Sequence, residues 1–293
     1  MADGTYTVLP VMRAVRRLAD GQTFGDRTIA ITLDDAYRSA VSQIAPRLIE
    51  LGIPFTLFVS PGMVGAGQDG DHADWPTLRA LKAKAGALMT VGARAMDNRR
   101  LALLDAAEQR RQIAAAIDRI EAELGVTPRL FSWPYGQYTA ALQELLTERG
   151  FIAAFGRQSG VAHNGDNALA LPRFSMIGEF GGLDRFRLAA EALPLPVYDA
   201  LPREPLVTKP NPALGFTVAD FLAPAAGIAC FAGGQGAVET TVLAGKRVEA
   251  RLPSPLTPGS ARLNCTLPER LAGEDRPRWR WYGRLLFYAP EAD

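Results

Sequence analysis

The sequence predicts an α/β domain built on parallel strands, followed by a smaller antiparallel β domain. Two observations predict this order. In the first part of the 293-residue chain, short β-branched runs alternate with stretches of helical periodicity. In the last part, short runs are separated by Gly and Pro, and no long helical stripe is present. The length also fits one large domain with a smaller one.

Strands and helices are expected in strict alternation, which is typical of a parallel sheet. The helix over 102–124 has the clearest pattern, with one apolar stripe and Gly125 as a left-handed end. That stripe contains Leu103, Leu104, Ile113, Ile117, Ile120 and Leu124. The expected strands are 28–35, 55–59, 87–92, 130–133 and 152–155, and the other expected helices are 36–51, 75–85 and 139–149.

A change of composition marks the domain boundary. Six prolines lie within 194–213, which predicts a linker or an extended wrap between a first domain, 1–193, and a second, 214–293. The second domain is predicted to be an antiparallel β-sandwich. Its expected strands are 215–218, 227–231, 240–243, 247–252, 262–266 and 280–288.

The charge balance and hydropathy exclude several classes of protein. The net charge is +1, so no strong field favours nucleic acid or an anionic membrane. No run of 18 apolar residues is present, so no transmembrane helix is expected, and the N-terminus has no signal-peptide pattern. The two cysteines, Cys230 and Cys265, leave two alternatives: one disulfide, or two buried thiols.

Two carboxylates close the first buried strand, at Asp34 and Asp35. The carboxyl ends of parallel strands are where α/β proteins build their sites. Successive strand residues point to opposite faces, so one carboxylate could bind a cation while the other takes a proton from water. The alternative is that these residues only cap the next helix.

A second candidate segment, 131–138, follows another strand end. Pro134 and Gly136 flank Tyr135, and this turn could direct a backbone N–H at a developing oxyanion. The aromatic residues beside it suit a sugar face. The alternative is a tight turn beside two core aromatics.

Together these motifs resemble the polysaccharide deacetylases of carbohydrate esterase family 4. Residues 32–36, Thr-Leu-Asp-Asp-Ala, resemble the family's Thr-Phe-Asp-Asp-Gly motif, and 131–136, Phe-Ser-Trp-Pro-Tyr-Gly, resemble its Pro-Tyr-Gly motif without the usual arginine. That variant is similar to deacetylases of exopolysaccharide and biofilm systems. Residues 150–155 and 171–173 are similar to segments that follow in the family, so the resemblance covers roughly 5–195.

The resemblance implies a distorted (β/α) barrel with fewer than eight strands and metal-assisted hydrolysis of N-acetyl groups on a polysaccharide or oligosaccharide. Asp34 would be the general base, Asp35 a ligand of a zinc-type divalent metal, and the backbone N–H of Tyr135 part of the oxyanion hole. The resemblance also implies a periplasmic or secreted location. The residues expected to contact the sugar are Trp133, Pro134, Tyr135 and Tyr138.

The metal motif of the family is broken in this chain. Its two histidines correspond to Arg94 and Asn98. A guanidinium stays protonated and offers only donors, so Arg94 cannot be a ligand, would repel a divalent cation and could pair with Asp35. The Asn98 carbonyl is a weak ligand for a transition metal. Asp97 could substitute, although as their neighbour it need not point inward.

The family's general-acid histidine has no counterpart before Asp34. The two histidines of the chain, His72 and His163, are both interpreted as loop residues at the surface or in hydrogen bonds rather than as ligands.

Three hypotheses follow. The first is a deacetylase of weak or lost activity. The second is a carbohydrate-binding pseudoenzyme, in which aromatics of the last strands form a sugar platform unless they pack in a core. The third is a hydrolase with a rebuilt site of Asp34, Asp35, Asp97 and a hard cation. The aromatics in question are Trp279, Trp281 and Tyr282.

Overall fold

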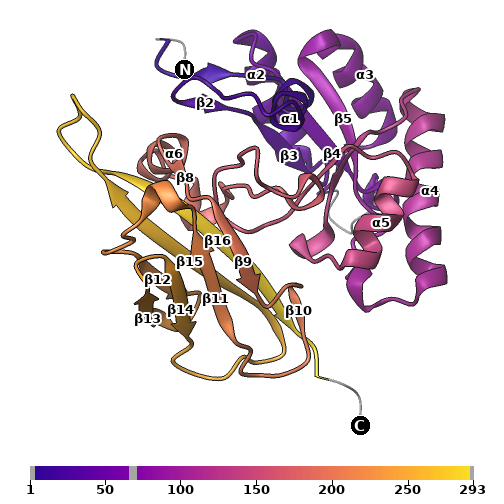
Figure 1. Ribbon diagram of the computed structural model, residues 1–293. Helices are drawn as coiled ribbons and strands as arrows, with labels where there is room; N and C mark the ends of the chain where they lie inside the picture. The colour runs from indigo at the N-terminus through magenta and orange to yellow at the C-terminus, as the bar shows by residue number, and fades with distance from the viewer. Residues whose placement is uncertain (1–3, 66–70, 291–293) are drawn as a thin grey trace. The chain divides into compact units, whose positions relative to one another are not determined.

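The structure is a computed structural model that describes residues 4–65 and 71–290 (Figure 1). It divides into two compact units. The first contains the residues up to Tyr135, with Ala141–Phe155 and Ala168–Ala170, and the second contains the remainder. This division differs from the predicted boundary near 193, because segments that follow the last parallel strands group with the β-rich unit.

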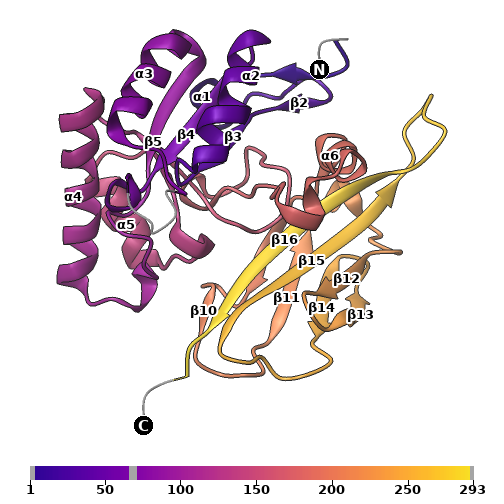
Figure 2. The same cartoon turned by 180° about the vertical axis from the view of Figure 1, so that it is seen from behind.

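The first unit is an α/β domain in which helices pack against a five-stranded parallel sheet. Its strands run in sequence order, β3–β4–β5–β6–β7, which is the winding of a (β/α) barrel with fewer than eight strands. Figure 2 shows α3 and α4 along one side of this curled sheet. The strands are β3 (Thr32–Asp34), β4 (Phe55–Val59), β5 (Met89–Ala93), β6 (Leu130–Ser132) and β7 (Ala153–Phe155). The helices are α1 (Val11–Ala19), α2 (Ala45–Glu50), α3 (Trp75–Ala85), α4 (Ala106–Leu124) and α5 (Ala140–Glu148).

The strand expected over 28–35 is split in two. Thr28–Ile29 forms β2, which pairs in parallel with β1 (Thr7–Val8), and only β3 joins the main sheet. The strand β4 is buried along its whole length, as expected for the middle of a parallel sheet covered on both faces. Gly92 of β5 leaves room for the Phe58 ring, since a Cβ at this position would lie 2.4 Å from ring atoms.

The long helix α4 begins later than predicted. Asp105 caps it by accepting a hydrogen bond from the backbone N–H of Glu108 (2.9 Å), so Leu101–Leu103 form a separate short turn. Leu103 is 52% exposed and does not belong to the buried stripe. Ile113, Ile120 and Leu124 are buried as predicted, and Gly125 ends the helix in the left-handed conformation.

The second unit is rich in antiparallel strands, which confirms the change predicted from composition. Its nine-stranded sheet has the order β10–β16–β15–β12–β13–β14–β11–β9, and β8 pairs with β16 beside this path. The proline-rich segment 194–213 is not a free linker, because it supplies part of β8 and all of β9 and β10. The elements are α6 (Leu183–Ala190), β8 (Leu193–Pro194), β9 (Val197–Leu201), β10 (Leu206–Val207), β11 (Leu214–Val218), β12 (Ala229–Ala232), β13 (Gly236–Leu243), β14 (Arg247–Arg251), β15 (Gly259–Glu269) and β16 (Arg278–Tyr288).

Cys230 and Cys265 lie opposite each other on β12 and β15 and form a disulfide. This settles the alternative left open by the sequence. The bond lies within the apolar core of the second unit, with both residues nearly inaccessible to solvent.

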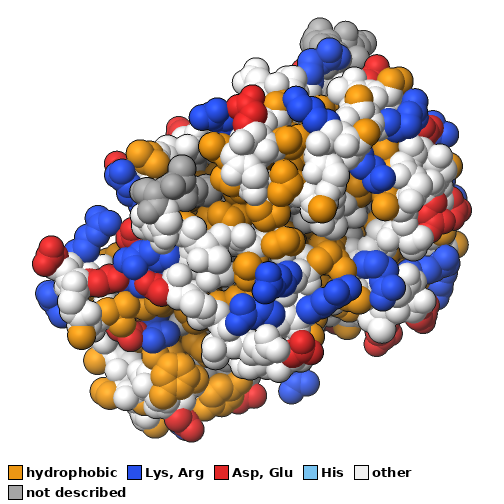
Figure 3. Space-filling model, turned by 90° about the horizontal axis from the view of Figure 1, so that it is seen from above, with side chains coloured by type: hydrophobic (Ala, Val, Ile, Leu, Met, Phe, Trp, Pro, Cys, Tyr) orange, Lys and Arg blue, Asp and Glu red, His pale blue; other side chains and the backbone are white. Residues whose placement is uncertain are grey.

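The described surface carries mixed charge. In Figure 3, basic side chains are scattered over the visible face, with acidic and uncharged side chains between them. Among the described helices, none is both long and apolar enough to cross a bilayer.

Candidate active site

Asp34 and Asp35 occupy the carboxyl end of β3. Asp34 is the last residue of the strand, and Asp35 and Ala36 follow with φ of 66° and 51°. The backbone N–H of Asp35 donates to the carbonyl of Phe58 (2.9 Å), which ties this sharp turn to the neighbouring strand. The Asp34 side chain is 27% exposed and that of Asp35 is 9% exposed. Asp34 is therefore the more accessible carboxylate of the pair.

Arg94 bridges the two carboxylates. Its Nη1 atom lies 2.7 Å from Oδ2 of Asp35 and 3.2 Å from Oδ2 of Asp34. Arg94 follows directly after β5, and its backbone N–H donates to the carbonyl of Val59 (2.9 Å). The guanidinium is buried, so the pairing with Asp35 expected from the sequence is confirmed and extends to Asp34.

Two serines complete the surroundings of the carboxylates. Ser60 Oγ donates to Oδ1 of Asp35 (3.0 Å), and Ser132 Oγ donates to Oδ2 of Asp34 (3.2 Å). Neither hydroxyl is predicted from the sequence. A signal was present, because Ser60 directly follows β4 and Ser132 ends β6, so each hydroxyl lies at the same sheet edge as the carboxylates.

Burial governs the protonation of Asp35. Its pKa is raised above the usual value, mainly because burial disfavours the charged carboxylate, and the charge of Asp34 raises it further. The guanidinium of Arg94, the hydrogen bond from Ser60 and the nearby His72 act in the opposite direction. Arg94 is the largest of the influences that keep this carboxylate ionised.

His72 is buried, so of the two alternatives predicted for this loop residue, a place at the surface or in hydrogen bonds, the surface place is wrong. Its ring stacks on Tyr37 with 4.6 Å between centroids, and the backbones of these two residues form an antiparallel bridge. Nδ1 of His72 has no hydrogen-bond partner among the described residues. His163, in contrast, is held in a local turn, where its backbone N–H donates to Oδ2 of Asp166 (2.8 Å).

The turn after β6 places Tyr135 in a left-handed conformation, with φ of 57°. Its hydroxyl donates to the carbonyl of Asn98 (3.1 Å), and the Arg100 guanidinium lies 4.6 Å from its ring centroid. Left-handed backbone is costly for a non-glycine residue, so these contacts must hold the turn in place.

The other residues expected to contact sugar are less accessible. Trp133 is fully buried, packs on Phe131 and donates from Nε1 to the carbonyl of Leu169 (2.9 Å), and Pro134 is also buried. The rings of Trp133 and Pro134 therefore support the turn rather than present a face to a sugar. Tyr138 belongs to the second unit, where burial raises the pKa of its phenol.

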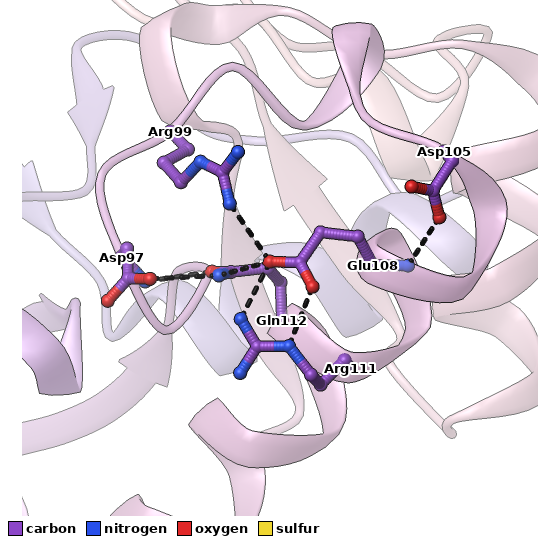
Figure 4. A network of polar contacts seen from close by, with 6 residues as sticks. All are labelled: Asp97, Arg99, Asp105, Glu108, Arg111 and Gln112. Atoms are coloured by element: carbon purple, nitrogen blue, oxygen red, sulfur yellow. Dashed lines mark hydrogen bonds and ion pairs between the residues drawn. The ribbon is translucent and has the colours of Figure 1, made fainter.

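The loop that carries Arg94 and Asn98 is fastened to α4 by a polar network (Figure 4). The backbone N–H of Asp97 donates to Oε1 of Gln112, and Nε2 of Gln112 donates to Oδ2 of Asp97, each across 2.9 Å. Nε2 also reaches Glu108, which binds Arg99 and Arg111. The Asp97 carboxylate is thus engaged by α4, which opposes the hypothesis that it rebuilds a cation site with Asp34 and Asp35.

A divalent metal does not fit the residues present. Both oxygens of Asp35 already have partners, Ser60 and Arg94, and the Arg94 guanidinium places a positive charge where the cation would bind. Among the described residues, no group of three or more His, Cys, Asp or Glu side chains could hold a metal ion.

The second unit has its own cleft, of about 480 Å³, between α6 and the start of β16. Trp279 lines it with 37% of its surface exposed. The other two aromatic residues predicted for a sugar platform pack against other rings: Trp281 contacts Phe174, and Tyr282 contacts Phe216. The charged lining residues are Asp184, Arg187, Glu191, Arg276 and Arg278.

The parallel sheet in sequence order, with paired aspartates at its carboxyl edge, defines a deacetylase-type α/β fold. Residues 21–154 match the family model described as polysaccharide deacetylase. This match covers a little under half of the chain and includes all five strands of the parallel sheet except the last residue of β7. Among curated proteins, none matches the sequence.

Solved structures share the fold. The Streptococcus pyogenes deacetylase PplD, solved with acetate, is 16% identical with a TM-score of 0.58, over 65% of this chain and 82% of that one. IcaB from Ammonifex degensii is 24% identical with a TM-score of 0.54, over 64% and 83%. The deacetylase domain of BpsB from Bordetella bronchiseptica is 18% identical with a TM-score of 0.51, over 58% and 78%.

Proposed function

We propose that this protein hydrolyses N-acetyl groups on a polysaccharide of the cell envelope or the extracellular matrix. The observation that carries the proposal is Asp34: a partly exposed carboxylate at the carboxyl edge of the sheet, beside a fixed guanidinium and a serine hydroxyl. The family match and the neighbours that are deacetylases by name support the same reaction.

The chemistry requires one base and one set of donors. Asp34 takes a proton from water, and the resulting hydroxide attacks the acetamide carbon. The backbone N–H of Tyr135 donates to the oxyanion that forms. Asp34 then returns the proton to the sugar nitrogen as the C–N bond breaks, which yields acetate and an amino sugar. Without a divalent ion to polarise the carbonyl, we expect this hydrolysis to be slow.

Acetate release from N-acetylglucosamine oligomers tests the proposal. We expect wild-type protein to release acetate slowly and Asp34→Asn to release about 100-fold less or none, because the base is lost. Asp118→Asn, an exposed position on α4, is the matched control and should match wild type. Equal acetate release by wild type and Asp34→Asn would contradict the assignment of the base.

The disulfide of the second unit supports a secreted or periplasmic location. A buried disulfide persists in oxidising compartments. A sandwich-like arrangement of this unit is supported by β13, which pairs with both β12 and β14, and by the 4.8 Å contact between the rings of Phe216 on β11 and Tyr282 on β16.

A carbohydrate-binding protein without hydrolysis is the second candidate function. It is favoured by the Trp279 cleft, since an exposed indole beside paired charges suits the face and hydroxyls of a sugar. Calorimetry with N-acetylglucosamine oligomers separates the candidates. Binding without acetate release, weakened by Trp279→Ala but not by Phe231→Ala at another exposed ring, would favour binding alone.

A further inference from the structure

Two arginines of the second unit, Arg157 and Arg262, lie within range of each other's charge. Both residues are half-buried, and neither guanidinium forms an ion pair or a hydrogen bond with a described residue. Burial lowers the pKa of Arg262, and the positive charge of Arg157 lowers it further. Like charges at close range raise the free energy of the folded state, and a bound anion would offset this cost.

The packing on β15 explains why the two side chains meet. Arg262 and Asn264 point to one face of β15, and the residue between them points into the apolar core. Gly283 of β16 pairs with Asn264, and a Cβ on Gly283 would overlap the backbone of Ser159. The segment that carries Arg157 therefore lies directly on the face of the sheet to which Arg262 points.

A second loop reaches the same face. Nε2 of Gln137 donates to Oγ of Ser260 (2.9 Å), and a Cβ on Gly136 would lie 2.7 Å from Cβ of Arg157. Gln137 is almost completely buried, and its Oε1 has no hydrogen-bond partner in the part of the chain that the structure describes. Arg262, two positions along the strand from Ser260, thus lies near an acceptor that lacks a donor. Such a place suits a ligand that presents an acid group together with a hydroxyl.

Both loops continue from the carboxyl edge of the parallel sheet. Gly136 directly follows the turn of Tyr135 after β6, and Arg157 lies two residues beyond the end of β7. Asp34, the proposed base, ends a strand at the same edge. The loops around Arg262 therefore begin at the edge of the sheet where the proposed hydrolysis takes place.

We propose that Arg157 and Arg262 bind an anionic substituent, a carboxylate or a phosphate, on the N-acetylated glycan. Each planar guanidinium offers a fork of donors that matches the oxygens of either group. The buried amide oxygen of Gln137 accepts from a hydroxyl of the same sugar. The glycan as the carrier of this charge rests on the proposed function, whereas binding of the anion is measured without hydrolysis.

Calorimetry with three probes is the test: a neutral N-acetylglucosamine tetramer, a tetrasaccharide of alternating glucuronate and N-acetylglucosamine, and N-acetylglucosamine 6-phosphate. Wild type should bind at least one charged probe more tightly than the neutral one. Arg157→Gln and Arg262→Gln should each weaken that binding by about tenfold, as loss of a hydrogen bond to a charged group does, and leave the affinity for the neutral tetramer unchanged. Arg251→Gln removes a charge from a side chain of β14 that is 84% exposed, and this control should bind every probe as wild type does.

The charged probes also identify the anion. Tight binding of the glucuronate probe alone assigns a carboxylate, and tight binding of the phosphate probe alone assigns a phosphate. Equal affinity of wild type for the charged and neutral probes would overturn the proposal, and so would charged-probe binding that survives both substitutions.

Two further readouts keep the result decisive. Should a variant not fold, the melting temperature of wild type with glucuronate, glucose 6-phosphate and glucose decides: a rise with an anionic sugar alone supports the arginine pair, and no difference refutes it. Charge-dependent binding without acetate release would count against hydrolysis and leave the arginine pair standing. Acetate release with binding that does not depend on charge would do the reverse.

Discussion

Arg94 donates to Asp35 across 2.7 Å, in a pair whose side chains are only 5% and 9% exposed. In the related deacetylases that the sequence resembles, the position of Arg94 belongs to a metal-binding histidine. The chain thus keeps the carboxylates of the family motif but balances them with its own cation. The pair also contributes to the stability of the fold, because removal of either charge would leave the other buried without a partner, at a cost in folding free energy.

Removal of the Arg94 charge should destabilise the first unit. Arg94→Met keeps much of the side-chain length but leaves the buried Asp35 carboxylate without its counter-charge. The free energy of unfolding should fall by about 3–5 kcal/mol, as expected for a broken buried ion pair. Urea denaturation gives the free energy of unfolding. Adding Asp35→Asn to Arg94→Met should recover part of the loss, because the stranded charge is then gone.

The more exposed ion pair of Arg79 and Glu123 is the control for the Arg94→Met variant. Its arginine side chain is 49% exposed, so Arg79→Met should cost no more than about 1 kcal/mol. An Arg94→Met variant as stable as Arg79→Met would show that the buried pair contributes little.

The acid stability of the α4 network depends on Glu108. Hydrogen bonds from Arg111 and then Gln112 lower its pKa from 4.5 to about 2. A lowered folded-state pKa stabilises the fold above the unfolded value, and this contribution is lost as the pH falls through about 2. Between pH 4.5 and 2, the melting temperature of wild type should therefore fall more than that of Glu108→Gln.

Measurement by circular dichroism across this range tests the idea, with Glu50→Gln as the control at an exposed pair with Arg47. Parallel melting curves for wild type and Glu108→Gln at every pH would exclude a role for Glu108 in acid stability. Because Gln112 links Glu108 to Asp97, loss of the network should also loosen the loop that carries Arg94.

Local sequence patterns were sufficient for the framework of the site. Asp34 and Asp35 follow a β-branched run, and their place at a strand end could be predicted because parallel strands build sites at that edge. Gly125 marked the end of α4, and the guanidinium of Arg94 excluded it as a ligand and suggested its pairing with Asp35. Each of these inferences needs only the chemistry of one residue or its near neighbours.

Long-range contacts could not be predicted in the same way. Ser132 reaches Asp34 from a strand 98 positions away in sequence, and Asp97 turns to Gln112 rather than to the carboxylates. His72 is buried because its chain segment pairs with the residues after Asp35, a pairing that leaves no local pattern. The start of α4, in contrast, could have been predicted from local sequence. Asp105 and Glu108 have the spacing of a helix N-cap, but the apolar residues before them suggested an earlier start.

Gly92 should be intolerant of any side chain. A Cβ at this position would lie 2.4 Å from the Phe58 ring and 3.1 Å from the Leu130 carbonyl, so both neighbouring strands would have to shift. Gly92→Ala should cost about 1–3 kcal/mol, as overpacking of a core does. Gly25→Ala, where the added atom meets its nearest neighbour at 3.8 Å, is the control. Equal unfolding free energies for the two variants would contradict the close approach of β4 and β5.

Loss of the disulfide should destabilise the second unit. Cys230 and Cys265 are 35 positions apart, and closing a loop of this length stabilises by about 3–4 kcal/mol in the chain-entropy view. Replacing both cysteines by Ala should lower the free energy of unfolding of this unit by that amount, measured by urea denaturation and followed through Trp fluorescence. Reduction of wild type with dithiothreitol should give the same shift, and the double variant should not respond to it. If wild-type protein is equally stable with and without reductant, the disulfide adds no stability beyond that of the hydrogen-bonded pairing of β12 with β15.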